Sequence, residues 1–262
     1  MNIILYILSG ILALVLFIFI HLLKMMRLYL ILLDEKIEFK RFIFAYFRTT
    51  FVNFIIPYKL GEIYRIFAFG RITGSFLKGF LSIVTDRFFD TLALVLVMLP
   101  MQILYKDTIS AVTVALPVFL AAVVFAFMIF PSVYGYLNRY IIINRSSERS
   151  MAVLRSLEII KTGYDKVREL ISGRYSLMII MSLGAWIFEG ILLFLLSLIL
   201  GIPFGAGDFC GYITSILSTG HEIVIQRQYF IFCFTGLLLM TIISFVICRL
   251  GAGPGRNNKD EA

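Results

Sequence analysis

Five apolar stretches, each long enough to cross a lipid bilayer, constrain the fold of this chain more than any other feature. A membrane-spanning α-helix needs about 20 consecutive, mostly apolar residues, because the hydrocarbon core is about 30 Å thick. The five predicted spans are residues 3–23, 79–104, 109–130, 175–200 and 229–250. Hydrophobic residues make up 60% of the 262 residues and charged residues only 15%. The sequence therefore predicts an all-α polytopic membrane protein with about five full transmembrane helices.

Basic residues are concentrated in two segments between the predicted spans. Residues 24–78 hold ten Lys or Arg against four Asp or Glu, and residues 139–174 hold eight against four. Cytoplasmic segments of membrane proteins carry such an excess. We therefore expect a protein of the inner membrane with both of these segments in the cytoplasm. The N-terminus would then lie outside, and the polar tail 251–262 would lie in the cytoplasm. No basic patch with interleaved aromatic residues lies elsewhere, so the net charge of +8 predicts no nucleic-acid partner.

Two segments fit neither a span nor an ordinary loop. Residues 42–69 are apolar and aromatic, but Arg48, Asn53 and Gly61 interrupt them and both flanks are basic. Because this segment begins and ends on the cytoplasmic side, we expect a re-entrant hairpin or a segment along the interface. Residues 205–228 are rich in glycine and lie between a span that leaves the cytoplasm and one that returns to it. They are expected to form a second re-entrant hairpin from the outside.

The order of these segments predicts an inverted repeat. Residues 1–104 and 175–250 each contain a span, a hairpin and a span, and the two sets run in opposite senses across the membrane. Residues 105–174 would join them through an extra span and a cytoplasmic linker, in which residues 149–161 have the spacing of an amphipathic helix. Many transporters form the substrate site between inverted repeats, because unwound backbone there is satisfied only by protein or a water-filled cavity.

Polar and charged residues at or near membrane depth mark the candidate substrate site. An ionisable side chain in the hydrocarbon costs about 2.5–3.5 kcal/mol on insertion scales, so such residues normally line a pathway or meet a partner. The candidate substrate-binding residues are Asn53, Pro57, Gly61, Glu62, Arg65, Asp86, Arg87, Asp90 and Glu222.

The chemistry of these residues suits a phosphate-bearing headgroup. Arg65 and Arg87 can bind phosphate through forked, charge-assisted hydrogen bonds. Asn53, and the backbone groups freed by Pro57 and Gly61, would supply neutral donors.

Helical spacing leaves a second interpretation open for the charged residues. Glu62 and Arg65 are one helical turn apart, as are Arg87 and Asp90, so each pair could simply neutralise its own charge. Asp86 lies on the same face as Asp90, and two acids so close either share a proton or bracket an arginine.

Outside these clusters, few residues suggest chemistry. Glu189 stands alone in a predicted span, where it is either a neutral acid hydrogen-bonded to another helix or part of a proton relay. Cys210, Cys233 and Cys248 lack metal-ligand spacing, and the two histidines are far apart in the sequence. We therefore expect no metal and no cofactor.

The motif residues carry a resemblance to a known family. Asn-x-x-x-Pro-x-x-x-Gly-Glu-x-x-Arg, followed about twenty residues later by Asp-Arg-x-x-Asp, resembles the membrane domain of the lysylphosphatidylglycerol synthetase/flippase family. In this sequence the matching residues are Asn53, Pro57, Gly61, Glu62, Arg65, Asp86, Arg87 and Asp90. The second half departs from the family pattern, because the segment ending in Gly220-His221-Glu222 stands where the family often has a proline and paired glycines.

The resemblance implies a flippase-like transporter that moves a phospholipid or a lipid-linked headgroup between membrane leaflets. Its partner would be a membrane lipid: an anionic or aminoacyl phospholipid, or a polyprenyl-phosphate-linked sugar. Two alternatives are a membrane-embedded transferase or synthase acting on aminoacyl or sugar lipids, and a membrane partner of a separate soluble synthase. The sequence contains no Asp-x-Asp motif and no nucleophile–base set, which favours binding and alternating access over catalysis.

Overall fold

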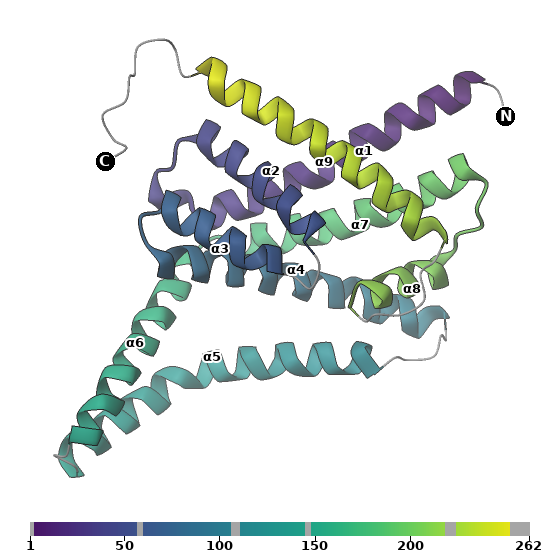
Figure 1. The fold of residues 1–262 in the computed structure, drawn as a ribbon. Coiled ribbons are helices and arrows are strands. Elements are labelled where there is room, and N and C mark those ends of the chain that lie inside the picture. Colours follow the sequence, from purple (N-terminus) through teal and green to yellow (C-terminus); the bar gives the residue numbers. More distant parts are fainter. Residues whose placement is uncertain (1–2, 57–59, 106–110, 145–147, 218–223, 252–262) are drawn as a thin grey trace.

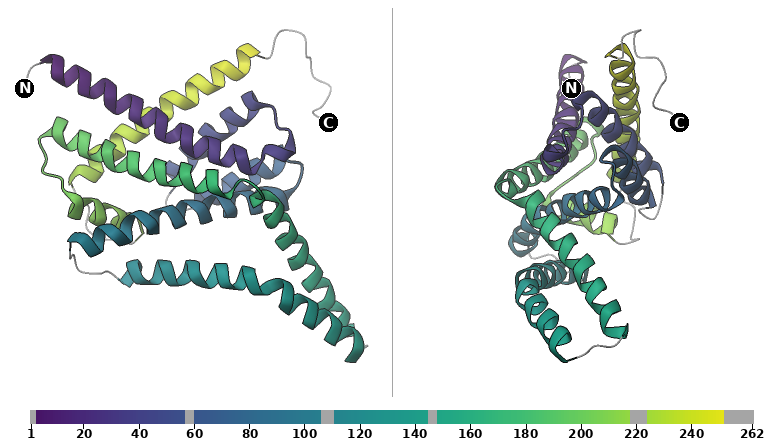
Figure 2. Two further views of the ribbon diagram at one scale, coloured as in Figure 1. Left: turned by 180° about the vertical axis from the view of Figure 1, so that it is seen from behind. Right: turned by 90° about the vertical axis from the view of Figure 1, so that its left-hand side faces the viewer.

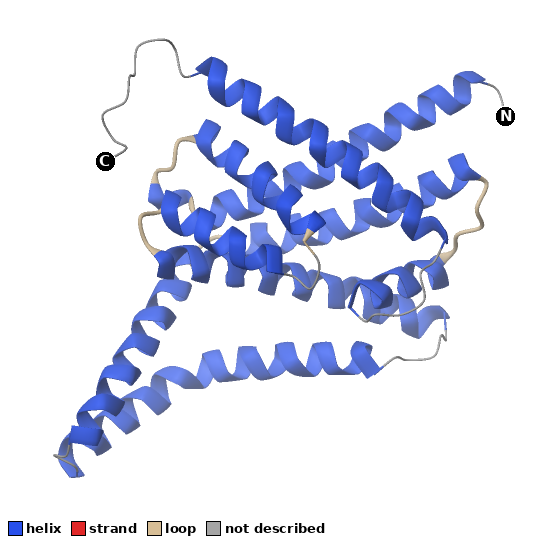
Figure 3. Cartoon of the chain, in the orientation of Figure 1, coloured by secondary structure: helices blue, strands red, loops and turns tan. Residues whose placement is uncertain are grey.

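The computed structural model describes residues 3–56, 60–105, 111–144, 148–217 and 224–251, and within these ranges the chain is helical without strands (Figures 1 and 3). The elements are α1 (Ile3–Ile31), the short 3-10 helix η1 (Leu33–Glu35), α2 (Phe39–Ile55), α3 (Leu60–Ile72), α4 (Phe76–Tyr105), α5 (Ala111–Asn144), α6 (Glu148–Ile171), α7 (Tyr175–Leu200), α8 (Ala206–Leu217) and α9 (Val224–Gly251). The prediction of an all-α fold is confirmed.

Four of the helices are long and apolar enough to cross a membrane. Among the described residues these segments are Tyr6–Ile31, Val114–Ile143, Tyr175–Leu200 and Ile225–Arg249. They correspond to four of the five predicted spans, and the chain is a multi-pass membrane protein. The fifth predicted span lies in α4, a helix of 30 residues that is not among the four. Its first half carries four charged residues, Lys78, Asp86, Arg87 and Asp90.

The bundle is held together by helix pairs, several of which are distant in sequence. Helix α1 packs along α7, α2 along α9, and α4 against both α3 and α7 (Figures 1 and 2). One apolar core joins α1, α7 and α9 through buried side chains that include Phe17, Ala185, Leu192 and Leu237. The start of α1 and the end of α9 lie at opposite ends of the bundle (Figure 1).

Helices α2 and α3 form a helical hairpin that covers the predicted segment 42–69. They lie against each other because Gly61, at the start of α3, lets the two backbones meet: a Cβ at Gly61 would lie 2.9 Å from Asn53 Cβ. A second close approach joins α3 to α4, where a Cβ at Gly79 would lie 2.6 Å from Gly70 Cα. These two approaches fix α3 between α2 and α4. The re-entrant position of the hairpin in the bilayer stays a prediction.

The second predicted hairpin, residues 205–228, is described only in part, and its re-entrant form stays a prediction. Helix α8 covers its first part, and Glu222 lies outside the described residues. Helix α9 begins at Val224 and continues without interruption to Gly251, so residues 224–228 belong to the last long helix rather than to a loop. The side chain of Ile225, at the start of α9, is buried in the bundle.

Helices α5 and α6 diverge from the rest of the bundle as a pair (Figure 2). Helix α5 continues to Asn144 through Pro131, well beyond the predicted end of its span at residue 130. The pair is held by aromatic packing, in which Phe127 and Phe130 of α5 lie 4.5 and 4.9 Å from the ring of Tyr164 on α6. The amphipathic helix predicted at residues 149–161 lies within α6.

Candidate functional site

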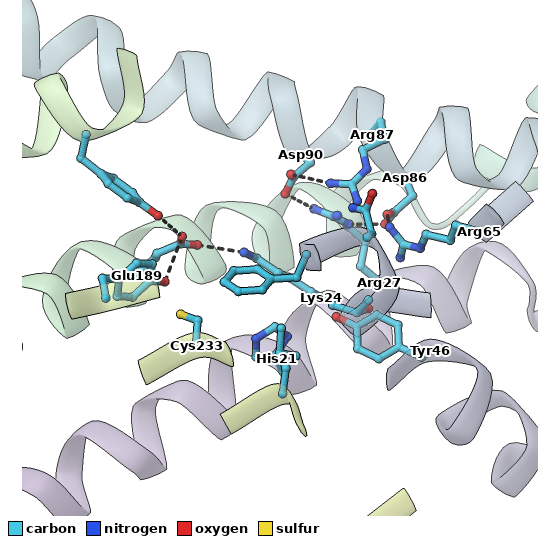
Figure 4. A pocket seen from close by; sticks show the side chains of 16 residues that line it. His21, Lys24, Arg27, Tyr46, Arg65, Asp86, Arg87, Asp90, Glu189 and Cys233 are labelled. Carbon is cyan, nitrogen blue, oxygen red and sulfur yellow. Dashed lines mark hydrogen bonds and ion pairs between the residues drawn. The ribbon is translucent and has the colours of Figure 1, made fainter. Parts of the chain in front are cut away.

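A polar cavity of about 320 Å³ lies inside the apolar bundle. Among the described residues, seven helices contribute to its lining, and none of the lining residues belongs to α5 or α6. Its lining residues are His21, Lys24, Arg27, Tyr46, Thr50, Asn53, Phe54, Arg65, Asp86, Arg87, Asp90, Glu189, Tyr212, Tyr229, Cys233 and Leu237. Figure 4 shows the charged side chains converging on one another from different helices. The lining contains four cationic and three carboxylate side chains, so the charge of the cavity is nearly balanced.

Arg27 of α1 joins the two aspartates of α4 at the centre of the charged network. Its Nε donates to Asp86 Oδ1 at 2.7 Å, and its Nη1 donates to Asp90 Oδ1 at 2.9 Å. The same Nη1 donates to Ser182 Oγ on α7 at 2.8 Å. The side chain of Arg27 is only 2% exposed. Of the two arrangements expected for Asp86 and Asp90, the structure therefore shows the one in which they bracket an arginine.

Arg65 of α3 lies nearer to α4 than to the acid on its own helix. Its Nη1 is 3.4 Å from Asp86 Oδ2, compared with 3.9 Å from Glu62 Oε2 one turn away. Its guanidinium also lies over the ring of Tyr46 on α2, 5.8 Å from the ring centre. Pairing of Glu62 with Arg65 along one helix is therefore the weaker of the two contacts, and Arg65 connects α2, α3 and α4.

Glu62 accepts hydrogen bonds from two neighbouring helices. Asn53 Nδ2 of α2 donates to Glu62 Oε1 at 2.7 Å, and Arg87 of α4 forms an ion pair with the same oxygen. Arg87 also contacts Asp90 on its own helix at 3.5 Å. At 41% exposed, the Arg87 side chain is the most accessible of the cationic groups in the network. Arg87 therefore pairs with Glu62 of α3 in addition to Asp90 of its own helix, which was the pair expected from helical spacing.

Glu189 of α7, the one acid of its predicted span, is hydrogen-bonded to residues of three other helices. Lys24 Nζ of α1 donates to Glu189 Oε2 at 2.8 Å. The hydroxyls of Tyr212 on α8 and Tyr229 on α9 donate to Glu189 Oε1 at 3.0 and 3.1 Å. The Lys24 ammonium also lies 5.5 Å from the ring centre of Trp186. The Glu189 carboxylate is thus held by residues of three other helices, α1, α8 and α9.

Several buried polar atoms along the cavity have no hydrogen-bond partner among the described residues. They are His21 Nδ1, Thr50 Oγ1, Asn53 Oδ1, Arg65 Nε and Arg87 Nε. Buried polar groups are normally satisfied by protein, water or a ligand, because leaving one unpaired costs free energy. These atoms are concentrated around one cavity, where they could therefore bind a polar molecule. In the described part of the chain, no three His, Cys, Asp or Glu residues are placed to hold a metal ion.

Most of the sequence-predicted site residues come together in this cavity. Asn53, Arg65, Asp86, Arg87, Asp90 and Glu189 line it. Glu62 contacts two of these residues, and Gly61 sets the approach of α3 to α2. Pro57 and Glu222 lie outside the described residues.

The sequence-predicted site residues did not include the two cations that α1 contributes. Lys24 and Arg27 were expected in a cytoplasmic flank, but α1 continues to Ile31 and carries both into the cavity. A signal for this was present. His21, Lys24 and Arg27 recur every three residues and so share one helical face, and apolar residues continue beyond them. Tyr212 and Tyr229 had no comparable signal.

The chain matches the model of one known protein family. The family model described as lysylphosphatidylglycerol synthase TM region matches residues 3–220, which is most of the chain. Searches of curated proteins and of solved structures find no match. The match includes the hairpin α2–α3, helix α4 and the charged residues that they bring to the cavity. The chain belongs to the lysylphosphatidylglycerol synthase TM region family.

Proposed function

We propose that this protein is a flippase-like transporter that binds the phosphate-bearing headgroup of a lipid in the polar cavity and moves it between the membrane leaflets. The observation that carries the proposal is the cavity itself, where guanidinium groups and unpaired polar atoms gather inside a bundle of apolar helices. The substrate would be a phospholipid or a lipid-linked headgroup.

The energetic cost of the charged network supports a functional role. Ionisable groups in a membrane protein are costly to bury, and ion pairs in a dry interior recover little beyond their desolvation penalty. A helix bundle that needed only stability would be better served by apolar side chains of similar volume. Arg27, Arg65 and Asp86 are each less than 6% exposed, so this penalty applies in full.

The unpaired donors suit the oxygens of a phosphodiester. Arg65 Nε and Arg87 Nε are N–H donors on permanently charged groups and have no partner among the described residues. Charge-assisted hydrogen bonds from guanidinium to phosphate are short and strong. Thr50 Oγ1 adds a neutral hydroxyl to the same cavity. A lipid bound in this way would keep its acyl chains in the bilayer while its headgroup stays out of the hydrocarbon.

The orientation in the membrane belongs to the same proposal. We infer an inner-membrane protein with its N-terminus outside, its C-terminus in the cytoplasm and two halves related by inversion. The opposite positions of the start of α1 and the end of α9 support the placement of the two termini on opposite sides of the membrane. In a background without native cysteines, Lys106→Cys should react with an impermeant thiol reagent added from outside, and Arg149→Cys should not. The reverse pattern of labelling would overturn the orientation.

Lipid transfer in reconstituted vesicles tests the function. Arg65→Ala should abolish movement of a fluorescent anionic phospholipid from one leaflet to the other, while the protein still inserts and purifies as a single species. Arg41→Ala is the matched control, because Arg41 is 74% exposed and contacts only the exposed Glu38 among the ion pairs of the described residues. If Arg65→Ala and Glu62→Gln both transfer lipid at the rate of the unmodified protein, the charged cavity is structural and the proposal fails.

A further inference from the structure

Lys24 lines the cavity, and its ammonium group lies among side chains that have the chemistry of an ammonium-binding cage. We define this cage by Glu189, Trp186, Tyr212 and Tyr229. Glu189 Oε2 accepts a hydrogen bond of 2.8 Å from Lys24 Nζ, and the centre of the Trp186 ring lies 5.5 Å from the same nitrogen. A carboxylate beside aromatic rings is how proteins bind ligand ammonium groups, through ion pairing and cation–π attraction. Here the bound ammonium belongs to the protein itself.

The cage is built independently of the residue that fills it. Glu189 and Trp186 are buried residues of α7, and the tyrosine hydroxyls that orient the carboxylate come from α8 and α9. Lys24 reaches in from α1, and its side chain is 24% exposed, compared with 8% for Glu189. The position of the carboxylate therefore does not depend on Lys24 alone.

At the other end of the cavity, each carboxylate is also matched by a cation of the chain. Asp86 and Asp90 share Arg27, and Glu62 is paired with Arg87. Among the buried side-chain atoms of the described residues, the cationic nitrogens without a hydrogen-bond partner are Arg65 Nε and Arg87 Nε, and both are N–H donors. An incoming anion would find donors in this cavity, whereas an incoming ammonium group would find its carboxylate already occupied.

We propose that Lys24 determines headgroup specificity: by filling the ammonium cage from within, it restricts the cavity to headgroups whose charge is a phosphodiester anion and excludes headgroups that carry an added ammonium group. This inference rests on the proposed function and narrows its substrate class. The cage would accept a ligand ammonium once Lys24 is removed. An aminoacylated phospholipid would then gain a partner that the unmodified protein withholds.

A competition between phosphatidylglycerol and its lysyl ester, which carries an added lysyl group with two ammonium groups, tests this inference. The full-length protein is equilibrated in phosphatidylcholine vesicles with equimolar phosphatidylglycerol and its lysyl ester, and the retained lipids are quantified by mass spectrometry. The unmodified protein should retain phosphatidylglycerol over the lysyl ester by about tenfold, because like charges in an enclosed site repel strongly. This comparison needs no variant, so it does not depend on how well any variant folds.

Variants of the cage then identify Lys24 as the cause. Lys24→Ala should lower the preference for phosphatidylglycerol by about tenfold, and Lys24→Met should shift it in the same direction. Lys24→Arg keeps the cation and should keep the preference. Lys78→Ala is the matched control. It also removes a paired cation, because Lys78 Nζ lies 2.7 Å from Glu35 Oε2, but neither residue lines the cavity.

Two double variants separate the cage from a general effect of charge. The altered preference of Lys24→Ala should disappear when Glu189→Gln removes the carboxylate. It should also disappear with Trp186→Leu, which changes no charge but removes the aromatic wall. A long-range electrostatic effect would instead survive the loss of Trp186, and that result would overturn the role of the cage.

The possible failures of the two proposals are distinguishable. If the unmodified protein prefers the lysyl ester, or if Lys24→Ala and Lys24→Met leave its preference unchanged, the role of Lys24 is wrong while lipid binding by the cavity stands. If the unmodified protein retains neither lipid above the level of the Arg65→Ala variant, the proposed function fails and this inference fails with it.

Discussion

Arg27 and Asp86 lie 59 residues apart in the sequence and form a hydrogen-bonded ion pair of 2.7 Å, in which neither side chain is more than 2% exposed. The pair joins α1 to α4 at the centre of the bundle. Because Arg27 also bonds to Asp90 and Ser182, one guanidinium connects three helices. This residue is therefore both a structural centre of the fold and a wall of the cavity.

Removing that guanidinium should destabilise the protein strongly. Arg27→Met keeps most of the side-chain volume but leaves Asp90 without its closest cation, and Asp86 only with the longer contact to Arg65. Breaking a buried ion pair from one side typically costs about 3–5 kcal/mol. Denaturant unfolding in detergent should show a loss of this size, whereas Arg41→Met, at an exposed pair, should change the free energy of unfolding by less than about 0.5 kcal/mol. Equal stabilities of the two variants would contradict the central role of Arg27.

Arg87 should not tolerate replacement by lysine. Its guanidinium contacts Glu62 and Asp90 at the same time and leaves Nε unpaired toward the cavity, whereas a lysine ammonium is a single point of charge. Arg87→Lys should therefore reduce lipid transfer in vesicles by about tenfold, with an unchanged elution profile and melting temperature. Transfer at the normal rate would mean that Arg87 only neutralises the acids beside it.

Gly61 should be required for the approach of α3 to α2. A Cβ at this position would lie 2.9 Å from Asn53 Cβ, so Gly61→Ala must separate the helices and lengthen the hydrogen bond from Asn53 to Glu62. Such overpacking typically costs about 1–3 kcal/mol. Denaturant unfolding should detect this loss, together with slower lipid transfer. Gly135→Ala is the control, because a Cβ there would meet nothing within 4 Å; a similar loss in both variants would argue against the close approach.

The ion pair between Asp34 and Arg174 should make stability depend on pH at the end of the bundle where α1 meets α7. Two hydrogen bonds of 2.6 and 2.9 Å from Arg174 hold the pKa of Asp34 below its ordinary value. A depressed pKa in the folded state contributes stability above the unfolded pKa of about 4, and this contribution is lost as the pH falls through the folded value. Arg174→Gln should therefore reduce stability more at neutral pH than in strong acid, as followed by melting temperature; the hydrogen bond from Arg174 to Leu30 O is lost at either pH. A difference between the two proteins that stayed constant with pH would refute this linkage.

The sequence predicted which segments form helices better than it predicted the residues at which those helices begin and end. Runs of apolar residues located the long helices, and the break near Gly61 located the helical hairpin, because length and hydropathy are local properties. The end of α1 was misplaced because Lys24 and Arg27 follow an apolar run, as residues at a membrane surface usually do. Their partners, Glu189 and Asp86, lie on other helices and become visible only when the bundle is packed.

The residues of the candidate site that belong to a sequence motif were predicted, whereas those outside any motif were not. The charged residues of α3 and α4 are grouped in sequence, so their interruption of apolar segments was sufficient to single them out. Tyr212 and Tyr229 are isolated tyrosines in apolar helices, and their hydroxyls acquire a role only because both reach Glu189. A residue type that serves equally well in packing and in hydrogen bonding gives no signal until its neighbours are known.

Photo-crosslinking from within the cavity tests the central claim most directly. Thr50 lines the cavity and its hydroxyl has no hydrogen-bond partner among the described residues, so a photoreactive amino acid at this position would face whatever the cavity holds. After irradiation in native membranes, mass spectrometry of the full-length protein should find an adduct with a phosphate-bearing lipid, and the adduct should be lost when Arg65→Ala is added. Adducts with neighbouring side chains alone, or a lipid adduct that Arg65→Ala leaves unchanged, would contradict the assignment of the cavity as a lipid-headgroup site.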